Sequence, residues 1–184
     1  TKGKALLIVE ALRKAGILVY AEVDGGYFKE TEVLVMLALL DIIDNPLQDI
    51  QLAAVLRSPI AGFTAEEMAT IRIKHQDSYF WNALNAFSLA NTCQLSSKVS
   101  DFIKKIENWR EAANQKSVPQ LIWKIYRETG YYDYVGAMPG GTLRQANLKA
   151  LYDRARQYEA TNFRGLFRFV RFIERMKERG SDLK

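Results

Sequence analysis

The run from Asp41 to Phe63, DIIDNPLQDIQLAAVLRSPIAGF, constrains the fold of this chain more than any other stretch. A long apolar helix is predicted to end at Asn45, because a residue before proline is pushed out of the helical region of backbone conformation. A second, short helix is predicted to begin near Asp49 and to end at Ser58, again before a proline. A tight turn with the shape of a helix-hairpin-helix then leads into a third helix. The run therefore predicts helices joined by turns.

Helical periodicity continues through the rest of the chain, with no strand predicted after residue 46. Thr64 and Glu67 form the sequence pattern of a capping box, which predicts the start of the third helix. A polar loop is expected over residues 91–97, and residues 131–134 are expected to lead into a loop at residues 139–141. The predicted helices cover residues 2–15, 30–43, about 49–58, 64–74, about 79–87, about 99–109, 118–129, 143–158 and 163–179.

One stretch is typical of a strand, at residues 17–23, ILVYAEV, followed by Asp24-Gly25-Gly26. A lone strand would leave backbone N–H and C=O groups without partners. We therefore expect it to belong to a sheet completed by residues outside this chain. The predicted fold class is mainly α, with one short N-terminal α/β remnant, and the chain is interpreted as a piece of a larger protein.

The composition is that of a soluble globular protein, with 48% hydrophobic and 26% charged residues among 184. No apolar run reaches the roughly 18–20 residues of a membrane span, and no signal peptide is recognised at the N-terminus. Cys93 is the only cysteine, which excludes a disulfide within the chain and a thiolate zinc site. A cytoplasmic location is expected. The net charge of +5 is a mild bias toward polyanions.

The common catalytic motifs are absent from the sequence. It contains no GxxxxGK[ST] loop, no GxGxxG turn and no GxSxG elbow. His75 is the sole histidine, which argues against a histidine-based metal site. Glu66 and Glu67 fall in the first turn of a predicted helix, where the helix dipole favours them. We therefore predict no catalytic residue and no metal ligand in this chain.

The first candidate site is the turn at residues 58–64. Gly62 can adopt backbone conformations closed to other residues, and free N–H groups at the start of the next helix can bind a phosphate. Such a contact would follow the duplex backbone and not its base sequence. The alternative is an ordinary turn between two helices packed over Phe63, and Glu66 and Glu67 favour this alternative because they place negative charge beside the turn.

The second candidate site is the last predicted helix. At about 100° per residue its arginines fall on one narrow stripe, while apolar residues fill most of the remaining surface. The stripe is predicted to contact phosphates or an acidic partner. The alternative is a solvated charged face that Glu174 and Glu178 partly neutralise. The stripe consists of Arg164, Arg168, Arg171, Arg175 and Arg179.

Several segments together resemble the UvrD-like superfamily-one DNA helicases. These are Gly16-Ile17, Gly25-Gly26-Tyr27-Phe28, Glu32, Asn45-Pro46, Asp49 and Leu56-Arg57-Ser58-Pro59-Ile60. The blocks IDNPLQDIQLAAVLRSPIAGF and LRQANLKALYDRARQYEATNFRGLFRFVRFIERM are similar in particular to the AddA subunit family of bacterial AddAB (RexAB) helicase–nucleases. The similarity extends over nearly the whole chain and is weakest at residues 78–115.

The resemblance implies that residues 1–45 are the C-terminal part of a RecA-like motor domain, with the order helix, strand, helix. Residues 46–184 would form an all-helical 2B-type insertion domain. The parent protein would be an ATP-dependent DNA helicase and exonuclease that acts with an AddB partner subunit in double-strand-break repair and recombination. Its ATP, Mg²⁺ and nuclease sites would lie outside this chain, which would hold no cofactor and contact no membrane.

The related helicases touch duplex DNA through a Gly-x-Gly turn in this domain. The matching positions are Ala61, Gly62 and Phe63, so only the central part of the pattern is kept. Arg57 and Thr64 flank the turn and complete the predicted DNA contact. The expected function is a non-catalytic domain that handles double-stranded DNA; the alternative is a protein-interaction module that docks on a partner subunit through the arginine stripe.

Overall fold

A computed structural model describes residues 26–74, 76, 78–90, 92–161 and 164–178. Within these ranges the ordered elements are helices, with no strand, which confirms the mainly α fold class. The predicted helix at residues 2–15 and the predicted strand at residues 17–23 lie outside the described residues.

Most of the helices begin and end close to the predicted positions; the exceptions are the long helix at residues 94–115, predicted at about 99–109, and the short helix at residues 131–136, which was not predicted. In chain order they are η1 (Tyr27–Lys29, a 3-10 helix), α2 (Thr31–Asp44), α3 (Asp49–Arg57), α4 (Ala65–Lys74), α5 (Phe80–Ala90), α6 (Gln94–Gln115), α7 (Val118–Thr129), α8 (Tyr131–Gly136), α9 (Gly141–Ala160) and α10 (Leu166–Glu178). In the part of the chain that the structure describes, none is long and apolar enough to cross a bilayer.

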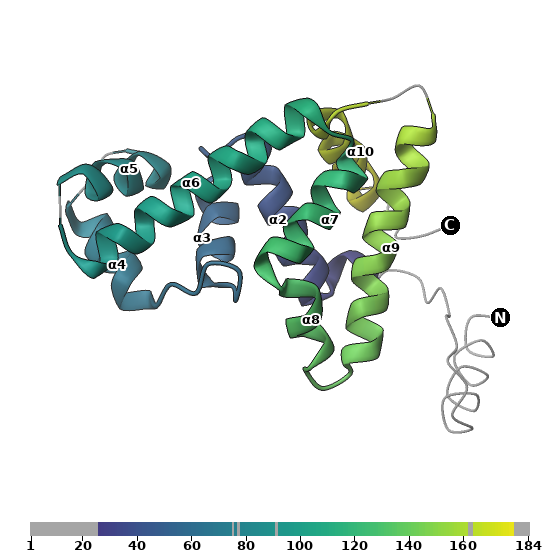
Figure 1. The fold of residues 1–184 in the computed structure, drawn as a ribbon, viewed down its shortest axis with the longest axis horizontal. Coiled ribbons are helices and arrows are strands. Elements are labelled where there is room, and N and C mark those ends of the chain that lie inside the picture. Colours follow the sequence, from purple (N-terminus) through teal and green to yellow (C-terminus); the bar gives the residue numbers. More distant parts are fainter. Residues whose placement is uncertain (1–25, 75, 77, 91, 162–163, 179–184) are drawn as a thin grey trace.

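The long helix α6 runs across the molecule and joins two groups of helices (Figure 1). Helices α3, α4 and α5 lie along one half of α6, and α7, α8, α9 and α10 gather beyond its other end. Helix α2 packs against α3, α6, α9 and α10, so it lies where the two groups meet. Its buried side chains, among them Val33, Met36, Leu40 and Ile43, form the centre of one continuous apolar core.

Helix α2 ends where the sequence predicts. Asn45 has an extended backbone (φ −139°, ψ 105°), as expected for a residue before proline. The helix is apolar on nearly every side because it is surrounded by other helices, with Leu34 the exposed exception at 44%. The division of the chain at residue 45 stays a prediction. Helix α2, which precedes residue 45, shares a core with α9 and α10, which follow that residue.

A buried polar contact ties α2 to α9. The carboxylate of Glu32, only 1% exposed, accepts hydrogen bonds from Arg144 Nη1 at 2.6 Å and from Asn147 Nδ2 at 2.7 Å. Tyr27 donates its hydroxyl to the backbone oxygen of Asn147 at 3.0 Å. A buried carboxylate needs such partners because burial removes its hydration.

Two predicted loops are shorter than the sequence indicated. Helix α6 begins at Gln94, inside the expected loop at residues 91–97, because Ser96 accepts a hydrogen bond from the Cys93 N–H at 3.0 Å and stabilises the first turn. Residues 131–134 belong to α8, which follows Gly130 in the left-handed conformation (φ 63°). Helix α9 starts at Gly141, where a Cβ atom would lie 1.9 Å from the Gly136 oxygen. Glycine therefore permits α8 and α9 to meet closely.

Candidate nucleic-acid interface

The turn between α3 and α4 has the predicted shape. Ser58 is extended (ψ 163°) before Pro59, and the chain then reverses through Gly62, whose φ of +66° is in the left-handed region that favours glycine. The Gly62 N–H donates to the Ser58 oxygen at 2.8 Å, and the Phe63 N–H donates to the Leu56 oxygen at 2.8 Å. These two bonds fix the reversal between the helices.

The capping box predicted at the start of α4 is confirmed. The Thr64 N–H donates to Glu67 Oε2 at 2.8 Å, and the Glu67 N–H donates to Thr64 Oγ1 at 3.1 Å. Hydrogen bonds from the Lys98 ammonium and the Thr64 N–H lower the pKa of Glu67. Hydrogen bonds from its own backbone N–H and from Thr64 lower the pKa of Glu66. Both glutamates are thus negative at neutral pH where a phosphate would approach.

The N–H groups of the turn are occupied within the chain. Ala61 donates to the Ser58 oxygen at 3.2 Å, and Ile60 donates to Ser58 Oγ at 3.3 Å. With the bonds of Gly62, Phe63 and Thr64 described above, every N–H from residue 60 to residue 64 has an internal acceptor. A phosphate contact at this turn stays a prediction, and these five N–H groups are not available for it.

A lysine that the sequence did not single out holds the turn in place. Lys98 of α6 donates from Nζ to the Gly62 oxygen at 2.8 Å and to Glu67 Oε2 at 2.7 Å. The same ammonium lies 4.5 Å from the centre of the Phe63 ring. Arg57 also supports the turn, donating from Nη1 to the Phe63 oxygen at 3.0 Å. Lys98 is more than thirty residues from the turn in sequence, so no local pattern could reveal its role.

A hollow of about 780 Å³ lies between the turn and α6. Two cations, Lys98 and Lys105, and two carboxylates, Glu67 and Asp101, line it. The charges are therefore balanced, which gives this hollow no strong preference for a polyanion.

The predicted DNA-binding residues of the turn differ in accessibility. Arg57, Gly62 and Thr64 are exposed and Ala61 is half-buried. Phe63 is 2% exposed, and its ring meets Phe102 of α6 edge to face at 6.0 Å. The Phe63 side chain is therefore packed against α6, as expected for an ordinary turn between two helices.

Helix α10 presents part of the predicted arginine stripe. Arg168, Arg171 and Arg175 are exposed, while Leu166, Phe169, Val170 and Ile173 are buried against the core. Arg164 does not belong to this helix face, because Gly165 (φ 95°) separates it from the start of α10 at Leu166. Arg179 lies outside the described residues. The stripe is shorter than the helical period predicted.

Arg171 is partly neutralised within the chain, as the alternative of a solvated face expects. Its Nη1 donates to Glu174 Oε2 at 2.9 Å, and its guanidinium lies 5.6 Å from the centre of the Phe167 ring. Phe167, beside these arginines, is 56% exposed. Helix α10 therefore shows an aromatic ring among its arginines.

Acidic residues of α2 face α10. Burial raises the pKa of Asp41 to about 6, with Lys177 opposing and Glu174 and Asp44 adding to the rise. Burial also raises the pKa of Asp44, opposed by Arg171 and Arg110. Some charged side chains of α10 thus interact with Asp41 and Asp44 of α2, and others are exposed to solvent.

The two predicted surfaces do not form one site. The α3–α4 turn and α4 lie at the left and lower part of Figure 1, and α10 lies at the upper right. Among the described residues no group of three or more acidic, histidine or cysteine side chains is placed to hold a metal ion.

The chain is similar over nearly its whole length to one segment of much longer proteins. It is 55% identical to the AddA subunit of the ATP-dependent helicase/nuclease of Anoxybacillus flavithermus over 97% of the chain and 15% of that protein. The corresponding proteins of Listeria monocytogenes and Desulforamulus reducens are 52% and 51% identical over 95% and 100% of the chain, and the chain covers 14% and 15% of them. No family profile matches. The resemblance to AddA-type subunits is confirmed.

Proposed function

We propose that this chain, whose sequence matches a segment of the AddA subunits of ATP-dependent helicase/nucleases, is a non-catalytic domain that handles double-stranded DNA. The observation that carries the proposal is the match itself, with 51–55% identity over almost every residue of the chain. The chain spans about one seventh of the length of these relatives. ATP hydrolysis with Mg²⁺ and nuclease chemistry are assigned to the remaining six sevenths of the parent protein.

In this proposal the duplex meets the turn between α3 and α4 from its exposed side. The backbone N–H groups of residues 60–64 do not carry the contact, because they have internal acceptors. Arg57 uses one guanidinium N–H to bond the Phe63 oxygen and has further donors, so with the exposed Lys105 it would approach phosphates. Gly62 and Thr64 would allow the DNA backbone to come near. Ala61 and Phe63 support the turn from beneath. Such binding is weak, independent of sequence and sensitive to salt.

A titration with a fluorescent 20-base-pair duplex tests the proposal. At about 50 mM salt we expect micromolar binding, with log Kd rising against log salt by about 0.9 for each phosphate neutralised. The double substitution Arg57→Ala and Lys105→Ala should reduce this slope by about 1.8. The matched control, Lys104→Ala with Lys149→Ala, removes the same charge from exposed positions outside the turn. Absence of any binding up to high micromolar concentration would refute direct contact with the duplex.

A second candidate function is docking on a partner protein through α10. The observation that favours it is the exposed Phe167 with Arg171 over its ring, beside Arg168 and Arg175. Exposed aromatic rings with arginines are typical of the centres of protein interfaces. The partner would be an AddB-type subunit of the parent complex.

Charge reversal separates the two functions. In the full-length parent protein, Arg168→Glu with Arg175→Glu should weaken assembly with the AddB-type partner but leave the duplex affinity of the turn nearly unchanged. Lys104→Glu with Lys149→Glu is the control with equal charge. If the α10 variant binds duplex poorly but assembles normally, the docking function is refuted and α10 joins the DNA-binding surface.

A further inference from the structure

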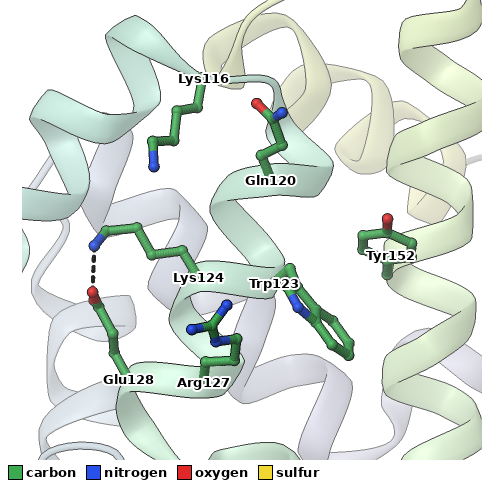
Figure 2. A pocket seen from close by; sticks show the side chains of 7 residues that line it. All are labelled: Lys116, Gln120, Trp123, Lys124, Arg127, Glu128 and Tyr152. Atoms are coloured by element: carbon green, nitrogen blue, oxygen red, sulfur yellow. Dashed lines mark hydrogen bonds and ion pairs between the residues drawn. The ribbon is translucent and has the colours of Figure 1, made fainter.

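A second hollow, of about 540 Å³, lies on the other group of helices, between α7 and α9 (Figure 2). Gln120, Trp123, Lys124 and Arg127 line it from α7, at spacings of three and four residues that place them on one helix face. Lys116 overhangs it from the end of α6, and Tyr152 faces it from α9. None of the predicted site residues belongs to this hollow.

Trp123 is a large apolar side chain left half in solvent. It is 48% exposed, whereas the other two tryptophans, Trp81 and Trp109, are 9% and 1% exposed. Its ring is supported by tyrosines on several sides, with centroid distances of 5.9 Å to Tyr152 and 6.4 Å to Tyr126. An aromatic ring held in this way keeps one orientation, so a second flat ring can stack on it with little loss of conformational entropy.

The hollow carries an excess of positive charge. Lys116, Lys124 and Arg127 line it against a single carboxylate, Glu128. Burial opposes ionisation of Glu128, but hydrogen bonds from Lys124 and Trp109 outweigh it and lower its pKa, so it pairs as a carboxylate with Lys124. Within the described residues Lys116 and Arg127 form no ion pair, and both are exposed. The hollow beside the turn differs in charge, because equal numbers of cations and carboxylates line it.

We propose that the hollow between α7 and α9 binds single-stranded DNA, with one base stacked on Trp123 and neighbouring phosphates on Lys116 and Arg127. A stacking aromatic surface beside cations is the arrangement by which proteins hold a single strand without sequence preference. A duplex does not fit this chemistry, because its bases are already stacked on one another. The proposal rests on the DNA-handling function in assigning DNA as the polyanion, but it uses a different surface and a different form of DNA.

Intrinsic fluorescence provides a direct measurement. Because Trp123 is the exposed tryptophan, stacking of a base should quench its emission when oligo(dT) is added to the chain at low salt. Trp123→Phe keeps an aromatic face and should retain affinity within about threefold while the quench disappears. Trp123→Leu keeps apolar volume but no ring, and should bind oligo(dT) about tenfold more weakly in an anisotropy titration. Tyr79→Leu, at an exposed aromatic just before α5 and outside every proposed site, is the matched control and should change neither measurement.

The phosphate contacts are tested separately by salt. Lys116→Ala with Arg127→Ala should make the dependence of log affinity on log salt shallower by about 1.4, since each phosphate neutralised on a single strand contributes about 0.7. Lys104→Ala with Lys149→Ala should leave the slope unchanged. Far-UV circular dichroism and thermal melting of every variant verify that the helices remain folded.

The outcomes distinguish this proposal from the function assigned to the turn. Loss of oligo(dT) binding in Trp123→Leu with unchanged duplex affinity supports it. Wild-type oligo(dT) affinity in Trp123→Leu, or a quench that survives in Trp123→Phe, overturns it even if the duplex binds at the turn. If the duplex does not bind but oligo(dT) binding is lost in Trp123→Leu, duplex binding at the turn is refuted and single-strand binding in the hollow is supported. Tight binding of poly-glutamate that depends on Trp123, without binding of oligo(dT), would make the hollow a site for acidic peptides and overturn the proposal.

Discussion

Charged side chains have different roles around helix α2 and around the turn at residues 58–64. Around α2 they are buried or half-buried and join helices: Glu32 meets Arg144 of α9, and Asp41 faces α10. Around the turn they lie near the surface and hold one loop, as Lys98 does when it bonds the Gly62 oxygen and Glu67. The first arrangement affects the stability of the whole fold, and the second affects the shape of one turn.

The difference bears on function because a cation with an internal partner has less to offer a ligand. Lys98 makes three contacts within the chain, so its position beside the turn does not make it a phosphate ligand. Arg127 and Arg168 are exposed and form no ion pair among the described residues. Cations of this second kind are where ligand binding is expected. The following changes test whether burial and internal pairing separate the two regions as described.

The largest effect is expected from Glu32→Ala. The substitution leaves Arg144 and Asn147 without the carboxylate that both now bond. Loss of one partner of a buried ion pair costs about 3–5 kcal/mol. Because the Arg144 side chain is 30% exposed and can regain water, we expect about 2–3 kcal/mol of the free energy of unfolding to be lost. Urea denaturation measures it, with exposed Glu107→Ala as control. A loss below about 1 kcal/mol would contradict a structural role for this pair.

Asp41→Asn should instead stabilise the protein at neutral pH. Burial raises the pKa of Asp41 from 3.8 in the unfolded chain to about 6 in the folded one. The folded state thus binds this proton more tightly, so the stabilisation is complete below pH 3.8 and is lost as the pH rises through about 6. At pH 7 the asparagine removes the cost of a buried carboxylate, which we expect to add about 1–2 kcal/mol to the free energy of unfolding.

Urea denaturation of Asp41→Asn at pH 4 and pH 7 checks both parts of this expectation. The difference from the wild type should be present at pH 7 and nearly absent at pH 4. Exposed Asp101→Asn is the control. Equal stabilities of Asp41→Asn and the wild type at both pH values would place Asp41 with the surface charges of the turn.

Local signals in the sequence predicted most of the helices and their ends. Proline after Asn45 and Ser58, and the Thr64–Glu67 capping box, each act within a few residues, so their effect can be deduced from neighbouring positions. The same reasoning failed where the local contact does not follow a common capping pattern. Helix α6 begins early because Ser96 bonds the Cys93 N–H, and α9 begins early because Gly141 packs on Gly136.

The candidate site was harder to predict because it depends on which side chains meet. The sequence showed that Gly62 could form a tight turn, but not that Lys98 would bond its carbonyl oxygen from α6. The helical period placed Arg164 on one face with Arg168, but α10 begins only after Gly165, so Arg164 is not part of the helix. Trp123 and Arg127 are four residues apart and could have been noticed as a pair. Their significance depends on Lys116 and Tyr152, which other helices bring to the same hollow.

Gly62→Ala tests the turn itself and should cost about 1 kcal/mol. The φ of +66° is unfavourable for alanine by about 1–2 kcal/mol, although no atom lies within 4 Å of the added Cβ. Gly26→Ala is a matched control, since it also has open space but a negative φ of −108°. Thermal melting measures both. Equal stability of the two variants would show that the turn changes conformation readily to accommodate alanine at residue 62.

Lys98→Ala should have the smallest effect and bears most directly on the contrast between the two regions. It removes a hydrogen bond to Gly62, an ion pair with Glu67 and a cation–ring contact with Phe63, all partly in solvent, so we expect a loss of about 0.5 kcal/mol at pH 7. The Lys98 hydrogen bond is the main cause of the lowered pKa of Glu67. That contribution is therefore present above the ordinary value of 4.5 and is lost as the pH falls through the lower folded value.

The stability gap between Lys98→Ala and the wild type should accordingly narrow in acid, which thermal melts at pH 7 and pH 3 would show. Lys104→Ala, on the same helix but outside the turn, controls for loss of charge. Duplex affinity should fall no further in Lys98→Ala than in Lys104→Ala, because the Lys98 ammonium already has partners within the chain. A tenfold larger fall would mean that Lys98 exchanges these partners for a phosphate. Internal pairing would then no longer separate the structural cations of this protein from those that bind DNA.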